Sequence, residues 1–340
     1  MAKVTRREAR LGAERLAVRL VAPPRGTAAV RGTVFVPPLI GGSGMQQVGY
    51  FRGLNRRGYR LATFDYRGHG KSLGRFSVRN ALADAVAALD DVLRATNDEP
   101  LLGLADCFGA IPLLHAATLR PGAFRSLVLV NPIHSLQAVA TPRALLANYF
   151  RPRDSAGERR FVWRNPLDLR GILLATNELL FPDIDKSRDH FGILSYADAH
   201  VWRTSWEYLV SRPLDGLVCG LPAIVWLGRS DGLLGLERPE EEARQRALWR
   251  RHLPQGDVRV IEDADHFWTG IRSRVGSVVA ESYAELEAAP RQRDPGEQFE
   301  RNHQLGGMTR SPGLKRTVGR YSSVSSSVGA SSSIDIAHRR

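Results

Sequence analysis

Short apolar runs of strand type alternate with longer segments of helical periodicity along most of this chain. This alternation is typical of βαβ units, in which helices connect parallel strands of one sheet. We predict an α/β fold with a mostly parallel central sheet flanked by helices. The predicted strands are 33–36, 60–65, 101–105, 126–130, 223–227 and 258–261, and the predicted helices are 46–57, 77–95, 111–119, 240–251 and 274–286.

The alternation is interrupted once and stops before the C-terminus. Residues 134–212 contain helical patterns and several aromatic side chains but no strand run, so we expect a helical lid inserted into the core. Residues 290–340 are rich in Ser and Arg and poor in apolar side chains, which predicts a disordered tail. Residues 1–15 are interpreted as a basic N-terminal arm. The core would then comprise residues 16–133 and 213–289.

Composition excludes several classes of function. Of the 340 residues, 43% are hydrophobic, so a sizeable core can be buried. No apolar stretch approaches the roughly 20 residues of a membrane-spanning helix, and the basic N-terminus lacks the apolar segment of a secretory signal. The formal net charge is +13, with much of the excess near the two ends. Because no nucleic-acid motif accompanies it, we interpret this charge as a solvated surface, with attraction of an acidic protein partner as the alternative.

The chain has two cysteines, Cys107 and Cys219. Without an export signal they are predicted to be reduced thiols of a cytoplasmic protein. No Cys/His cluster has metal-ligand spacing, so neither a metal nor another cofactor is expected.

The strongest local signal is the segment 101–110, Leu-Leu-Gly-Leu-Ala-Asp-Cys-Phe-Gly-Ala. A predicted strand runs into a helix through a tight turn, with small residues two positions before and after Cys107. Such a turn holds a nucleophile outward, and small side chains at Ala105 and Gly109 let strand and helix approach. The helix N-terminus would favour the thiolate form of Cys107.

With this segment the chain resembles the α/β-hydrolase superfamily over roughly residues 18–287. Residues 65–72, Asp-Tyr-Arg-Gly-His-Gly-Lys-Ser, are similar to that family's D-x-R-G-x-G-x-S turn after the fourth strand. Residues 228–231, Gly-Arg-Ser-Asp, resemble its acid-bearing turn, and residues 263–267, Asp-Ala-Asp-His-Phe, its histidine loop. The order nucleophile, acid, histidine is the order this fold requires.

The resemblance implies a role for each residue. Cys107 would attack a carbonyl carbon and carry the acyl group as a thioester, and His266 would move the proton. Asp231 would hold the imidazole tautomer. The backbone N–H of Phe108 is one predicted oxyanion donor. The second is expected from the loop 37–42, where two prolines replace the usual His-Gly pair; because proline has no N–H, we assign it to Leu39.

Other residues could compete for these roles. Cys219 is interpreted as a small buried hydrophobe, and His69 and His115 as structural. Asp263 and Asp265 are the competing acids, but they are too close in sequence to His266 for the family geometry. Asp106 directly precedes the nucleophile, where a negative charge would oppose thiolate formation.

A cysteine nucleophile suits transfer of acyl groups between thiols, because exchange of one thioester for another is nearly isoenergetic. In this respect the chain is similar to Cys-type aminoacyltransferases and acyltransferases that act between carrier proteins in peptide natural-product (secondary) metabolism, and to thioesterases. We therefore expect an acyltransferase or thioesterase acting on carrier-protein or CoA thioesters. An acidic acyl or peptidyl carrier protein would be the partner, its phosphopantetheine arriving with the substrate. The alternatives are an ester or lactone hydrolase of dienelactone-hydrolase type, and a catalytically retired hydrolase fold that acts as a binding protein.

Overall fold

The computed structural model describes residues 3–27, 29–39, 42–134, 212–231, 234–236, 238–266, 268 and 271–289. The chain divides into two units, Met1–Ala289 and Pro290–Arg340, and every described residue belongs to the first. The predicted tail and, except for His134 and Arg212, the predicted lid lie outside the described residues.

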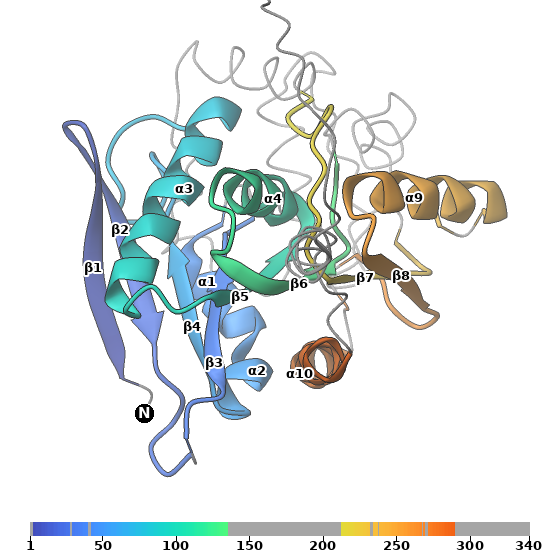
Figure 1. The fold of residues 1–340 in the computed structure, drawn as a ribbon, viewed down its shortest axis with the longest axis horizontal. Helices are drawn as coiled ribbons and strands as arrows, with labels where there is room; N and C mark the ends of the chain where they lie inside the picture. The colour runs from blue at the N-terminus through green and yellow to red at the C-terminus, as the bar shows by residue number, and fades with distance from the viewer. Residues whose placement is uncertain are drawn as a thin grey trace, which may run out of the picture. The chain divides into compact units, whose positions relative to one another are not determined.

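The described part of the first unit is built on an eight-stranded sheet of order β1-β2-β4-β3-β5-β6-β7-β8 (Figure 1). The pairs β1–β2 and β2–β4 are antiparallel, and the other five pairs are parallel. The predicted α/β fold with a mostly parallel sheet is therefore confirmed. The strands are β1 Val4–Leu11, β2 Glu14–Val21, β3 Gly32–Val36, β4 Tyr59–Phe64, β5 Leu101–Asp106, β6 Phe124–Val130, β7 Ala223–Gly228 and β8 Gly256–Ile261.

Helices cover both faces of this sheet (Figure 1). On one face lie α3 Val78–Ala95, α4 Ala110–Leu119 and α9 Pro239–His252, and on the other α1 Gly44–Tyr50, α2 Arg52–Arg56 and α10 Arg272–Ala288. Each face has its own apolar cluster, and neighbouring residues of one strand alternate between them. In β3, Phe35 belongs to the cluster under α3 and α4, whereas Val34 and Val36 belong to that under α10. Successive strand side chains point to opposite faces, so a sheet covered on both sides is apolar at every position.

The interpretation of residues 1–15 as an arm differs from the structure. Most of this range is β1, the edge strand, which is joined to β2 by a hairpin. Its charged side chains are largely exposed, whereas Ala9 is buried. Charged residues are common on edge strands because they discourage pairing with another chain, and this composition hid the strand from the sequence pattern.

One predicted helix is two helices in the structure. Phe51 ends α1 and begins α2, with φ −92° and ψ 20°, inside the range 46–57 predicted as continuous. The Phe51 side chain at this break is fully buried in the cluster under α10. No helix among the described residues is long and apolar enough to cross a membrane.

Candidate active site

Cys107 occupies a strained turn at the carboxyl end of β5. It begins a short 3-10 turn, Cys107–Gly109, that leads directly into α4, and its φ is 48°. A left-handed conformation is unfavourable for a residue with a Cβ and persists only where the surroundings enforce it. A Cβ on Gly109 would lie 2.8 Å from the carbonyl oxygen of Pro37, so glycine is required there. The sulfur is thus presented at the end of the sheet, at the start of a helix.

One predicted oxyanion donor, Phe108, lies in this turn, and the other, Leu39, lies in the loop after β3. Phe108 follows the nucleophile and is fully buried, its ring packed against Tyr66 and Phe76. Leu39 is buried in the loop after β3, the loop that contacts Gly109 through Pro37. The Tyr66 hydroxyl donates a 2.8 Å hydrogen bond to the carbonyl of Pro38. Tyr66 therefore helps to hold the Leu39 loop against the turn, although its hydroxyl was not singled out in the sequence.

The structure brings the predicted acid and histidine together. Asp231 follows β7, is fully buried, and accepts a 2.6 Å hydrogen bond from Nδ1 of His266. Its other carboxylate oxygen accepts from the backbone N–H of Leu234 at 3.1 Å. Of the two competing acids, Asp263 pairs with Arg274 at the surface.

The electrostatics of His266 connect it to Cys107. Burial lowers the pKa of His266, but the charges of Asp231 and Cys107, together with the hydrogen bond to Asp231, raise it well above the ordinary value. A protonated imidazole beside the sulfur stabilises a thiolate, and a carboxylate behind the imidazole stabilises the imidazolium.

Asn131 positions the histidine loop, a role the sequence reasoning missed. It follows β6 with φ 43° and is fully buried. Its amide nitrogen donates to the carbonyls of Asp265 and His266, both at 2.8 Å, and its amide oxygen accepts from Gly228 N–H at 2.6 Å. One side chain thus joins the end of β7 to the loop that carries His266. The available signal was an asparagine directly after a buried strand.

The turn after β4 lies on the other side of β5 from β7 and is held by polar contacts. The buried carboxylate of Asp65 accepts from Arg19 at 2.6 Å, from Gly44 N–H at 2.8 Å and from Lys71 N–H at 2.9 Å. Gly44 is the first residue of α1, so Asp65 anchors the helix that follows the Leu39 loop.

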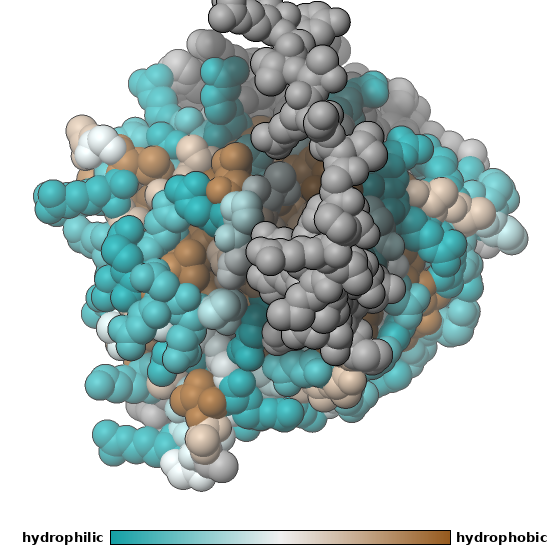
Figure 2. Space-filling model, viewed as in Figure 1, coloured by the Kyte–Doolittle hydropathy of each residue, from teal (hydrophilic) through white to brown (hydrophobic). Residues whose placement is uncertain are grey.

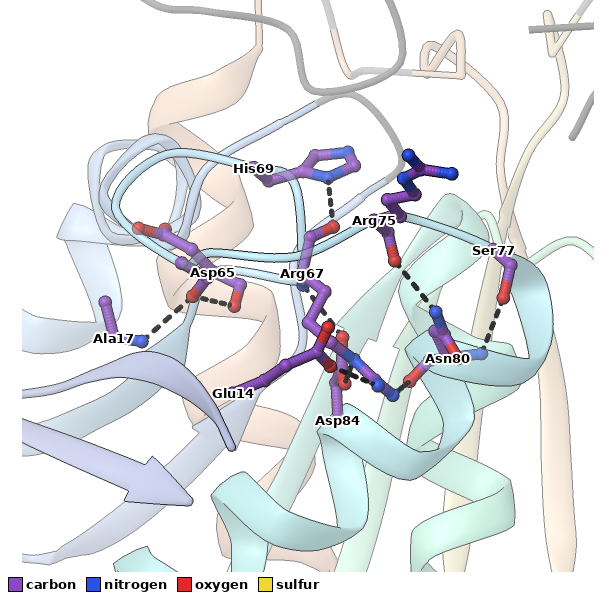
Figure 3. Close-up of polar contacts among 10 residues, drawn as sticks. Glu14, Ala17, Asp65, Arg67, His69, Arg75, Ser77, Asn80 and Asp84 are labelled. Carbon is purple, nitrogen blue, oxygen red and sulfur yellow. Dashed lines mark hydrogen bonds and ion pairs between the residues drawn. The ribbon is translucent and has the colours of Figure 1, made fainter. Parts of the chain in front are cut away.

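The rest of the turn is held by Arg67 and Ser72. The Arg67 guanidinium contacts Asp84 and Glu14, both at 2.6 Å (Figure 3). The Ser72 hydroxyl donates to the carbonyl of Asp65 at 2.6 Å and accepts from the N–H of Ala17 at 2.9 Å. The residues of the D-x-R-G-x-G-x-S turn therefore stabilise the turn itself, and none of these contacts involves Cys107.

The other cysteine and histidines considered in the sequence, Cys219, His69 and His115, lie in surroundings typical of structural residues. Cys219 is buried, and burial raises the pKa of its thiol. His69 is buried against Tyr66 and Phe76, and burial lowers its pKa to about 4. His115 lies on α4, where burial also lowers its pKa. Among the described residues, no group of three or more His, Cys, Asp or Glu side chains could hold a metal ion.

Asp106 is a buried acid that directly precedes Cys107 and is not part of the predicted triad. It is the last residue of β5 and is 4% exposed. Burial raises its pKa to about 7, opposed by the charge of His266, a backbone hydrogen bond and a hydrogen bond from the Gln47 side chain. The pKa of Tyr50 is also raised, first by burial and then by the charges of Asp106 and Asp265, with a smaller contribution from Cys107. Gln47 and Tyr50, both on α1, thus belong to the surroundings of the nucleophile.

Comparisons with known proteins agree with this architecture. Residues 32–156 match the family described as serine aminopeptidase, S33. A lysophosphatidylserine lipase of Gallus gallus is 27% identical over 140 residues, which cover 40% of this chain and 35% of the lipase. The chain therefore spans about a third of that curated relative.

Solved structures share the fold at low sequence identity. Est1E of Butyrivibrio proteoclasticus with ferulic acid bound superposes with a TM-score of 0.53 at 16% identity, covering 83% of this chain and 100% of Est1E. A proline iminopeptidase-related protein of Thermus thermophilus gives a TM-score of 0.53 at 20% identity, covering 84% and 98%. The matching family is named for serine, whereas in this chain Cys107 occupies the strained turn between β5 and α4, called the elbow below. The sheet order, the strained turn at Cys107 and these two superpositions show that the chain has the α/β-hydrolase fold.

Proposed function

We propose that this protein is an acyl-transfer enzyme that forms a thioester between an acyl group and Cys107, acting on carrier-protein or CoA thioesters. The observation that carries the proposal is a cysteine at the elbow whose sulfur interacts with His266, which is itself bonded to Asp231 at 2.6 Å. This is the nucleophile, base and orienting acid of covalent acyl transfer.

The reaction proceeds in two exchanges at one carbonyl carbon. The Cys107 thiolate attacks the substrate thioester, and the backbone N–H groups of Phe108 and Leu39 stabilise the oxyanion. The bond from carbon to the substrate sulfur breaks, and His266 gives its proton to the departing thiolate. An acceptor thiol then loses its proton to His266, attacks the acyl-Cys107 carbonyl and releases the Cys107 thiolate. With water as the acceptor, the same steps release a carboxylic acid.

Intact-protein mass spectrometry with acyl and aminoacyl pantetheine thioesters tests this proposal. We expect a mass increase equal to the acyl group, absent in Cys107→Ala and slowed at least 10²-fold in His266→Ala because general acid–base catalysis typically contributes that much. Cys219→Ala is the matched control and should acylate normally. Absence of an adduct from the folded wild-type protein would contradict the proposal and leave ester or lactone hydrolysis, or a binding protein, as the interpretation.

The fate of the adduct separates transfer from hydrolysis. If the acyl group passes to an added thiol faster than to water, the protein is an acyltransferase. If the adduct decays to free acid at a rate independent of the thiol concentration, it is a thioesterase.

A groove on the outer helical layer supports an acidic carrier protein as the partner. Its volume is about 570 Å³, and its apolar lining residues include Leu82, Val86 and Leu119. Arg79 and Arg94 are among the basic residues that line it. On the face that contains α3, Figure 2 shows brown apolar surface between teal polar side chains. A basic rim around an apolar floor is complementary to an acidic amphipathic helix.

Two features favour a separate acidic partner over this chain itself. A second copy carries the same net charge of +13 and would be repelled, and residues 290–340 contain more Lys and Arg than Asp and Glu.

Charge reversal tests this docking surface. Arg79→Glu combined with Arg94→Glu should raise KM for an acyl carrier-protein thioester about 10-fold or more and leave KM for the free pantetheine thioester unchanged, because only the protein meets the groove. Arg56→Glu, an exposed arginine on α2, is the control. Equal effects on both substrates, or none on either, would remove the groove from the proposal.

A further inference from the structure

A basic cavity of about 480 Å³ lies on the β1–β2 hairpin, against the turn after β4. In β2, Leu16, Val18 and Leu20 belong to the apolar cluster under α3 and α4. Because successive strand side chains point to opposite faces, Ala17 and Arg19 point away from that cluster. The cavity therefore belongs to the polar face of the hairpin.

The strand register brings charged side chains together on this face. Arg6 of β1 stands directly opposite Arg19 of β2, and Glu8 stands directly opposite Ala17. The Ala17 side chain is a single methyl group, which leaves room beside Arg19. Like charges directly opposite each other destabilise a pair of strands, so an anion bound between Arg6 and Arg19 would relieve a cost that the fold otherwise bears.

The acids near the cavity do not neutralise all of its lining cations. Three of these cations have acidic partners, in the pairs Arg7–Asp91, Arg15–Glu8 and Arg19–Asp65. The other two, Arg6 and Lys71, are exposed and form no ion pair with any described residue. The cavity thus keeps two positive charges.

Arg19 adds an unused hydrogen-bond donor. Its side chain is 8% exposed, and its Nη1 is buried without a hydrogen-bond partner among the described residues. Its Nη2 bonds to the carboxylate of Asp65, which also accepts from Lys71 N–H at 2.9 Å, so Asp65 holds Arg19 and Lys71 close together. Buried donors in proteins are almost always satisfied, and a guanidinium with free N–H groups suits the oxygens of a phosphate.

We propose that this cavity binds a phosphate group through Arg6, Arg19 and Lys71. A phosphate monoester carries up to two negative charges near neutral pH, which matches the two cations that have no acidic partner. Its oxygens accept several hydrogen bonds, including one from Nη1 of Arg19. The site goes beyond the proposed acyl transfer, because none of its residues belongs to the triad or to the Leu39 loop.

Two sources share this chemistry, free phosphate ion and the phosphates of CoA. β2 lies three strands from β5, about 14 Å across the sheet at the usual strand spacing. An extended pantetheine arm can span such a separation, so one CoA thioester could reach both the cavity and Cys107. Only this second source rests on the proposed function.

Calorimetric titration of the full-length protein with inorganic phosphate at low ionic strength tests the site without acylation. Arg6→Gln/Lys71→Gln should weaken phosphate binding about 10-fold or more, because charge-assisted hydrogen bonds are lost. Arg52→Gln/Arg56→Gln is the matched control, since it removes the same charge from exposed positions of α2 and should bind phosphate as the wild type does. All four side chains are exposed, so both variants should melt at or above the wild-type temperature. Absence of binding to the wild type, unchanged affinity in Arg6→Gln/Lys71→Gln, or equal weakening in the control would each overturn the inference.

An acyl-CoA and the matching acyl-pantetheine, which has no phosphate, separate the two sources. If the cavity binds CoA, KM should be lower for the acyl-CoA, and Arg6→Gln/Lys71→Gln should remove the difference. If it binds free phosphate, the double variant should lose phosphate binding and leave both KM values unchanged. If neither thioester acylates Cys107, the proposed function fails, and the phosphate titration still decides whether the cavity is an anion site.

Discussion

Cys107 combines a reactive side chain with an unfavourable backbone conformation, and neighbouring residues hold both in place. Its φ of 48° is enforced by the close approach of the turn to Pro37 at Gly109 and by the backbone N–H of Ile133, which bonds to the Cys107 carbonyl at 3.2 Å. Strain of this kind is typical of catalytic turns, where geometry is maintained at the expense of stability.

Asp106 should make the protein less stable as the pH rises. Its pKa is 3.8 in a model peptide and about 7 in the folded protein, so the folded state holds the proton more tightly. The free energy of unfolding is not reduced below pH 3.8. It falls by about 1.4 kcal/mol per pH unit up to about pH 7 and is constant above that. We expect Asp106→Asn to gain about 3 kcal/mol over wild type between pH 5 and pH 8, measured by urea unfolding. A difference that does not change with pH, as expected for the exposed control Asp98→Asn, would contradict the assignment.

Asn131 should be required for both stability and acylation. Asn131→Ala removes three side-chain hydrogen bonds, two of them buried and one part-buried, which we expect to cost about 3 kcal/mol. It should also slow acylation of Cys107 because the loop carrying His266 loses its attachment. Asn97 is a matched control, since it has φ 57° on an exposed turn. Asn97→Ala should lose about 1 kcal/mol of unfolding free energy, the cost of the left-handed conformation, and should keep the full rate of Cys107 acylation. Equal losses in both variants would assign the effect to backbone strain alone.

At the level of elements, the turn after β4 connects the antiparallel edge of the sheet to the site. Asp65 bonds to β2 through Arg19, to α1 through Gly44 and to its own turn through Lys71. Gly70, at φ 49°, cannot carry a side chain, because a Cβ would collide with the Asp65 carboxylate. The motif therefore determines where α1 begins, and with it the position of Gln47.

Neutralising Asp65 should destabilise the protein strongly. In Asp65→Asn the Arg19 guanidinium, whose side chain is 8% exposed, stays buried without its counter-ion. Breaking a buried ion pair costs about 3 to 5 kcal/mol, whereas exposed pairs contribute about 0 to 1 kcal/mol. Asp263→Asn, which breaks the exposed pair with Arg274, is the comparison in a urea titration. A loss below about 1 kcal/mol in Asp65→Asn would show that the pair does not anchor the turn.

At the scale of the whole molecule, the division of the chain places the boundary of the core at Ala289. The C-terminal helix α10 ends at Ala288, and Pro290–Arg340 forms the second unit. The low apolar content of that segment gives it little surface to bury.

Removal of residues 290–340 should therefore leave the core intact. We expect the truncated protein to melt within about 2 °C of the full chain and to acylate Cys107 at the same rate, because the elements that carry the triad end before Ala289. Differential scanning calorimetry and mass spectrometry measure the two quantities. A decrease of the melting temperature by more than about 5 °C would place contacts of the tail within the core.

The parallel sheet and the elbow could be predicted from the sequence because both depend on local patterns. Short apolar runs between amphipathic helices specify βαβ units, and small residues around Cys107 specify the turn. The charged edge strand β1 and the break at Phe51 were missed, since each is stabilised by contacts with residues distant in the sequence. The lid and tail stay predictions from composition.

The sequence by itself determined which residue types stand at the ends of the strands: a cysteine after β5, an aspartate after β7 and a histidine before α10. The family resemblance already favoured Asp231 over Asp263 and Asp265, but only the tertiary structure shows its 2.6 Å bond with His266 and shows that Asn131 holds the histidine loop. The same holds for the basic cavity, whose lining residues come from β1, β2 and the turn after β4. Contacts between residues so far apart in the chain depend on how the strands are ordered in the sheet, and strand order is not a local property of the sequence.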